Sequence, residues 1–132
     1  MLSKEKLVDE AKQQAKKFID IRDEREKRVN SASQKTLSSS QLRKFFNEFK
    51  RLEMRLKSGQ DYSLVEPLIA LQVAQVNYAW ARKKIPASFK NFIECEVKKI
   101  KDQDSFVEFM KFFEAIVGFY YYFAKEYKLK ID

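Results

Sequence analysis

The chain has 132 residues, and only 2 are Gly and 2 are Pro, about a quarter of the usual combined share of roughly 12%. This shortage of turn-forming residues excludes a β-sandwich, a β-barrel and a glycine-rich nucleotide-binding fold. The chain contains no His, which excludes every mechanism that needs a histidine base, nucleophile or metal ligand. Hydrophobic residues make up 45% of the chain, with 12 Phe and 6 Tyr, which is enough to fill a core.

Positive charge is concentrated in the first half of the chain. There are 27 Lys and Arg against 19 Asp and Glu, a formal net charge of +8. Residues 1–60 hold 16 of the basic and 9 of the acidic residues, so they carry +7 of this total. A field of this kind favours a polyanion such as nucleic acid or an anionic membrane. A basic face that only contacts solvent explains the charge equally well.

The sequence predicts neither export nor a membrane span. The chain becomes charged at Lys4 and Glu5, before any apolar signal core, and the uncharged run over residues 115–124 is too short to cross a bilayer. The single cysteine, Cys95, permits no internal disulfide, and without His it permits no zinc site of the usual kinds. We therefore expect a cytoplasmic protein with no metal, no cofactor and no membrane partner.

Residues 1–28 are predicted to contain one long N-terminal helix, beginning at about Lys4. Its apolar residues recur at three- and four-residue steps. After Ile21 the segment is almost entirely charged, with opposite charges four residues apart such as Asp23 and Lys27. We expect this part to stay helical while partly exposed. Residues 29–36 are small and polar without periodicity, and they predict a linker.

The second helix has a sharply defined start and end. Ser38 and Gln41 have the spacing of a capping box, and Leu37 and Leu42 occupy the two positions of a hydrophobic staple. Basic residues fill its last turn, and Gly59 follows at the position that favours a left-handed backbone.

The third helix begins between Ser63 and Pro67, because Ser63 suits a cap and Pro67 suits a first turn. It ends before Pro86. The fourth helix covers about residues 87–101 and has an apolar side rich in Phe and Ile.

The fifth helix starts at residue 104 or 105 and continues to about residue 128. It is apolar nearly all round, which predicts burial at the centre of a bundle. We therefore predict an all-α fold in a single domain over residues 1–132. It is a compact helical bundle of about five helices, of which the first is the long, partly exposed N-terminal helix and the other four form the bundle over residues 37–128.

The second helix is also the best candidate for a binding surface. A helical projection places its Phe and Leu side chains on one arc and its cations on the opposite arc. Arg matches phosphate oxygens with its planar fork, and Lys acts as a point charge. At about 1.5 Å per residue, these cations extend over roughly 20 Å, enough for several phosphates. They are Arg43, Lys44, Lys50, Arg51, Arg55 and Lys57.

A second basic cluster lies at the end of the third helix. It consists of Arg82, Lys83 and Lys84, and favourable charge at a helix C-terminus explains it better than a binding role does. Lys35 is a further candidate from its charge alone. The aromatic run over residues 119–123 is interpreted as core packing, because consecutive helical residues point in different directions and form no stacking platform.

No set of residues predicts catalysis. Glu94 and Glu96 face different sides of a helix, and Glu108 and Glu114 are also poorly spaced for a general acid–base pair. There is no metal-binding pattern and no Ser–His–Asp arrangement. We therefore expect a protein that is not an enzyme.

Three stretches of the chain carry extended motifs. They are residues 37–52, LSSSQLRKFFNEFKRL, residues 71–82, LQVAQVNYAWAR, and residues 106–123, FVEFMKFFEAIVGFYYYF. In this order they resemble the opening T-S-S-Q-L-R-K element, the Tyr-x-x-x-Arg element and the terminal helix of one known family, the small helical subunit of type III-A CRISPR effectors, which is the second subunit of the Csm complex. The three stretches occur in the family's order. The charged N-terminal segment lies outside them.

The resemblance implies a non-catalytic subunit of an RNA-guided interference complex. Such subunits stack in copies along a filament of backbone subunits, beside the other Csm proteins, and contact target RNA and the guide–target duplex through basic helix faces. Within the matching stretches lie Arg43, Lys44, Lys50, Arg51 and Arg82. Charge placement alone adds Arg55, Lys57, Lys83, Lys84 and Lys35. The residues by themselves leave open a structural or adaptor bundle that binds an acidic protein and has no role with nucleic acid.

Overall fold

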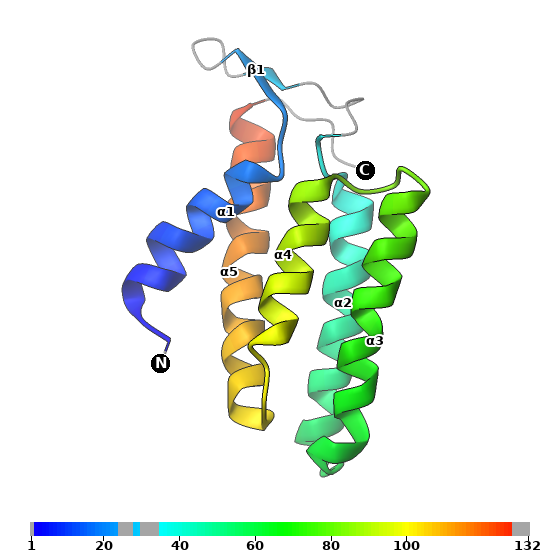
Figure 1. Ribbon diagram of the computed structural model, residues 1–132. Helices are drawn as coiled ribbons and strands as arrows, with labels where there is room; N and C mark the ends of the chain where they lie inside the picture. The colour runs from blue at the N-terminus through cyan, green and yellow to red at the C-terminus, as the bar shows by residue number, and fades with distance from the viewer. Residues whose placement is uncertain (1, 24–27, 30–34, 128–132) are drawn as a thin grey trace.

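The computed structural model is a bundle of helices with one short hairpin at its edge (Figure 1). It describes residues 2–23, 28–29 and 35–127. In chain order its elements are the π-helical turn η1 (Lys6–Glu10), α1 (Ala11–Lys17), β1 (Ile21–Asp23), β2 (Arg28–Val29), α2 (Ser39–Lys57), α3 (Tyr62–Ala81), α4 (Ala87–Lys98) and α5 (Gln103–Glu126). The prediction of an all-α fold with about five helices is confirmed.

The N-terminal helix is shorter than predicted. It ends at Lys17, and β1 then pairs antiparallel with β2, so the prediction of a helix continuing to residue 28 is wrong. The charged stretch has no apolar stripe to bury, and ion pairs four residues apart contribute only about 0.2–0.5 kcal/mol each. Residues 24–27, and residues 30–34 of the predicted linker, lie outside the described part of the chain.

The chain turns after Lys17 because its next apolar residues pack into the core. Phe18 is fully buried and Ile19 nearly so. The Leu37 N–H donates to the Phe18 carbonyl at 2.7 Å, and the Asp20 N–H donates to the Thr36 hydroxyl at 2.8 Å. These bonds hold the end of α1 beside the start of α2, and α1 itself lies along α5 (Figure 1).

Aromatic rings form the centre of the core. Phe113 of α5 lies 5.3 Å from the ring of Phe46 on α2 and 5.7 Å from that of Phe92 on α4. Phe18 closes the cluster from the N-terminal side, 5.3 Å from Phe89 of α4. Burying one such side chain contributes about 1.5–3 kcal/mol, and edge-to-face pairing adds about 0.5–1.5 kcal/mol. The predicted burial of α5 on most sides follows from this cluster.

Helix α2 begins and ends as predicted. The Ser38 hydroxyl accepts from the Gln41 N–H at 3.3 Å, and Leu37 and Leu42 are both fully buried. The second half of the predicted capping box is not formed, since the Gln41 amide oxygen is buried and bonds to none of the described residues. At the other end Gly59 adopts a φ of +107° and closes a Schellman motif.

Helix α3 starts one residue before the predicted range of residues 63–67, and α5 starts one or two residues before the predicted start at residue 104 or 105. For α3 the cap is Asp61, which accepts from the Ser63 hydroxyl at 2.7 Å, so Pro67 lies inside the helix. For α5 the cap is Asp102, with Ser105 as its reciprocal partner three residues on. In both cases a serine that the sequence favours as a cap lies inside the first turn. In α5 the Asp102 carboxylate takes the capping role by accepting from the Ser105 N–H, whereas the Asp61 side chain makes no capping bond to the backbone of α3.

One buried hydrogen bond ties the middle of α5 to the start of α2. The Tyr120 hydroxyl donates to the Leu37 carbonyl at 2.7 Å, and both side chains are fully buried. A buried carbonyl that loses its donor costs free energy, since water cannot replace the bond.

We expect Tyr120→Phe to lower the free energy of unfolding by about 1–3 kcal/mol, measured by urea denaturation followed by circular dichroism. Tyr122→Phe is the matched control, because Tyr122 is half-exposed and we expect a change within about 0.5 kcal/mol. An equal effect of the two substitutions would contradict a stabilising role for the Tyr120 bond.

Candidate nucleic-acid interface

Helix α2 presents the predicted basic face to the outside. Arg43, Lys44, Arg51 and Lys57 are exposed, and Lys50 and Arg55 are half-exposed. The opposite side of the helix is buried, and its core residues are Leu42, Phe45, Phe49, Leu52 and Leu56. The burial of this apolar side fixes the direction in which the cations point.

Two of the six cations neutralise a buried carboxylate. Glu53 is only 4% exposed, and its Oε1 lies 3.0 Å from Lys50 Nζ and 3.9 Å from Lys57 Nζ. The hydrogen bond to Glu53 raises the pKa of Lys50. A buried carboxylate without a cation is strongly unfavourable. Lys50 and Lys57 are therefore needed to neutralise Glu53 within the fold. The position of Glu53 next to the apolar arc of α2 could have predicted this pairing from the sequence.

Arg51 and Arg55 are held more loosely. Arg51 Nη1 lies 3.3 Å from Glu48 Oε1, and Arg55 Nε donates to Gln60 Oε1 at 2.9 Å. Exposed ion pairs of this kind contribute about 0–1 kcal/mol. A guanidinium has several N–H donors, so one such bond does not saturate it.

A groove of about 400 Å³ lies between α2 and α3. Its cations are Lys44, Arg51 and Arg55, and its lining residues are completed by Phe45, Glu48, Leu52, Leu68, Leu71, Gln72 and Gln75. The structure thus brings three predicted binding residues of α2 together with a wall from α3. The two glutamines were missed from sequence, although they are polar residues three apart in a stretch of α3 that is otherwise apolar from residue 67 to residue 76.

The second basic cluster caps the end of α3. Arg82 Nη1 donates to the Tyr78 hydroxyl at 3.0 Å. Lys83 has a φ of +60°, the left-handed conformation, and its N–H donates to the Trp80 carbonyl at 2.9 Å. Lys84 is exposed beside it. Since α2 and α3 run antiparallel, the cluster lies at the end of the bundle where α2 begins (Figure 1), and exposed Lys35 immediately precedes that helix.

The outer face of α3 is exposed and uncharged. Residues 67–81 contain no charged side chain. Leu64, Leu71 and Tyr78 follow one another at seven-residue steps on this face and are 63%, 52% and 60% exposed. Large apolar side chains exposed at regular steps along a helix are typical of a protein contact surface.

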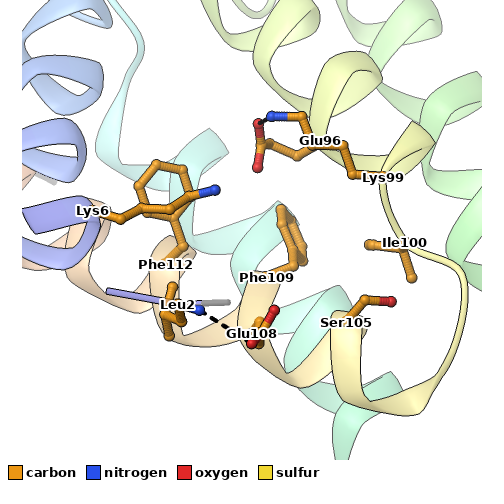
Figure 2. A pocket seen from close by; sticks show the side chains of 9 residues that line it. All are labelled: Leu2, Lys6, Glu96, Lys99, Ile100, Ser105, Glu108, Phe109 and Phe112. Carbon is orange, nitrogen blue, oxygen red and sulfur yellow. Dashed lines mark hydrogen bonds and ion pairs between the residues drawn. The ribbon is translucent and has the colours of Figure 1, made fainter. Parts of the chain in front are cut away.

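A smaller pocket of about 160 Å³ lies between the N-terminal segment, α4 and α5 (Figure 2). The Leu2 N–H donates to Glu108 Oε1 at 3.2 Å, and Lys6 Nζ lies 4.9 Å from the centre of the Phe112 ring. Lys99 pairs with Glu96 at 2.9 Å. Its charges therefore alternate in sign and compensate one another, which does not suit a polyanion.

Neither a metal site nor acid–base chemistry is supported by the described residues. Among them no three His, Cys, Asp or Glu side chains cluster as metal ligands would. The hydrogen bond from Lys90, 2.7 Å away, lowers the pKa of Glu94, whereas a general acid at neutral pH needs a raised one. No helix in the described ranges is long and apolar enough to cross a membrane.

Comparison with known proteins gives one match. The family model described as Csm2 Type III-A matches residues 2–126, which includes the N-terminal segment outside the three motif stretches. No curated protein and no solved structure matches the chain.

We expect Lys83→Gly to raise the free energy of unfolding by about 0.5–1 kcal/mol, because a glycine adopts the left-handed conformation without steric cost. Lys83→Ala is the control, since it removes the same charge and keeps a Cβ atom. Thermal and urea denaturation measure both variants. A gain of equal size in the alanine variant would attribute the effect to charge and would contradict backbone strain at this position.

Proposed function

Given that the chain belongs to the Csm2 Type III-A family and is a small subunit of a type III-A CRISPR effector complex, we propose that it contacts target RNA paired with the guide. In this proposal it acts in the cytoplasm, stacks in copies along the backbone filament beside the other Csm subunits, and leaves cleavage to them. The resemblance of the three motif stretches supports each of these points.

The observation that carries the RNA role is the cation-lined groove between α2 and α3. Lys44, Arg51 and Arg55 lie along one groove and are not bound to the buried Glu53. Contacts of this kind to phosphates are tolerant of sequence and release counterions, so binding weakens steeply as salt rises. The remaining predicted residues, at Lys35 and at 82–84, extend the positive surface at the end where α2 begins.

The uncharged outer face of α3 supports the assembly role. The second candidate function is that of an adaptor that binds only an acidic protein. The α3 face supports contact with a protein but does not indicate that this protein is acidic. Its apolar character, however, provides no charge for an acidic partner, and the cations lie in the neighbouring groove. We therefore assign RNA to the groove and a neighbouring subunit to the part of the α3 face that carries Leu64 and Tyr78, with Leu71 on the border between the two.

We expect the triple variant Lys44→Glu, Arg51→Glu, Arg55→Glu to bind single-stranded RNA at least about tenfold more weakly at low salt. The slope of log affinity against log salt should fall by about 2, at about 0.7 per lost phosphate contact. Fluorescence anisotropy at several salt concentrations measures both quantities.

The matched control is Lys98→Glu, Lys101→Glu, Lys125→Glu, in which three exposed cations outside the groove are reversed. Both variants change the net charge equally, so only the position of the charge differs. Equal losses would show that the groove has no special role. Absence of RNA binding by the unaltered protein, together with capture of an acidic partner, would favour the adaptor.

We expect the double variant Leu64→Glu, Ala74→Glu to fold normally and to recover less of the other Csm subunits when the complex is co-purified, because charge on an apolar contact face must be desolvated. The control is Val8→Glu, Met54→Glu, which adds the same charge at exposed apolar positions elsewhere. Full recovery with the α3 variant would exclude this face as the contact.

A further inference from the structure

We propose that the groove between α2 and α3 receives an unstacked base of single-stranded RNA, with the Gln72 amide bonding to the edge of that base. This inference rests on the proposed function and concerns a nucleotide of the bound RNA that is not paired with the guide. The groove volume of about 400 Å³ lies within the range of roughly 300–1,000 Å³ that small-molecule sites occupy.

Gln72 is the first reason for this assignment. It is only 8% exposed and lines the groove, yet its Oε1 bonds to none of the described residues. Buried polar atoms are nearly always paired in folded proteins, so an unpaired one needs an explanation. A rotation of the Gln72 side chain that brings its Oε1 into the groove breaks no hydrogen bond to that oxygen. An N–H donor of a ligand in the groove could then bond to the oxygen.

The residues that line the groove indicate that the N–H donor to the Gln72 oxygen is a nucleic-acid base. Leu68 and Leu71 of α3, with Phe45 and Leu52 of α2, provide apolar contact for a flat ring. Every RNA base carries an N–H group on its Watson–Crick edge, which is open in single strands and closed in a duplex. Gln75, three residues after Gln72 on the same wall, can both donate and accept.

The cations fix the orientation of such a nucleotide. Lys44 and Arg55 lie eleven residues apart on α2, about 16 Å along the helix, with Arg51 between them and paired with Glu48. Phosphates on either side of the inserted base can therefore meet a cation while the base enters between them. An apolar protein helix in the same groove would leave the Gln72 oxygen without a donor, which is why we favour RNA over a peptide.

The test compares two labelled oligomers with the same number of phosphates, an oligouridylate of about 12 nucleotides and its abasic counterpart. Anisotropy with the full chain should show oligouridylate binding at least about fivefold more tightly. Gln72→Leu should weaken oligouridylate binding by about threefold to tenfold and leave the abasic oligomer unchanged. Asn77→Leu, at an exposed amide of α3 that does not line the groove, should change neither.

A second variant keeps the proposal testable if Gln72→Leu fails to fold. Leu71→Ala shortens a half-exposed side chain on the groove wall and removes apolar contact with the base, so it should reduce oligouridylate binding selectively, as Gln72→Leu does. Equal binding of the two oligomers by the unaltered chain would overturn the base site and leave RNA binding intact. Binding of neither oligomer, with or without binding of an acidic peptide, would overturn the proposed function as well.

Discussion

The packing of Phe113 against rings from two other helices is the contact on which the arrangement of the bundle depends. Its ring meets Phe46 of α2 and Phe92 of α4 at 5.3 and 5.7 Å, so both helices are held at fixed positions around α5. Close-packed interiors tolerate little displacement of such rings. Because the aromatic side of α2 is fixed inward, its cations point outward, and the position of the basic face is a consequence of the core.

The cations of α2 have two different roles, which the net charge alone does not distinguish. Lys50 and Lys57 balance the buried Glu53 carboxylate, and their contribution is to the fold. Lys44, Arg51 and Arg55 line the groove with α3, and their contribution is to the surface. The net charge of +8 therefore overstates the positive charge that is available to a polyanion. A substitution of Lys50 or Lys57 would disturb the fold as well as any binding, because it would leave Glu53 with one cation fewer.

Local patterns allowed most of the fold to be predicted from sequence. Ser38, Leu37 and Gly59 define α2 through contacts within a few residues, and the structure confirms both of its ends. The end of α1 could not be predicted, because it depends on the bond between Phe18 and Leu37, which lie nineteen residues apart. The groove could not be predicted either, because Arg51 and Gln72 belong to different helices and only the packing of α2 against α3 brings them together.

Leu37 makes the position of α2 depend on two other segments of the chain. Its N–H is bound to the end of α1 and its carbonyl to Tyr120 of α5, so a single residue joins three segments immediately before the first turn of α2. A displacement of the end of α1 would therefore strain two short bonds at the base of the helix that carries the cations.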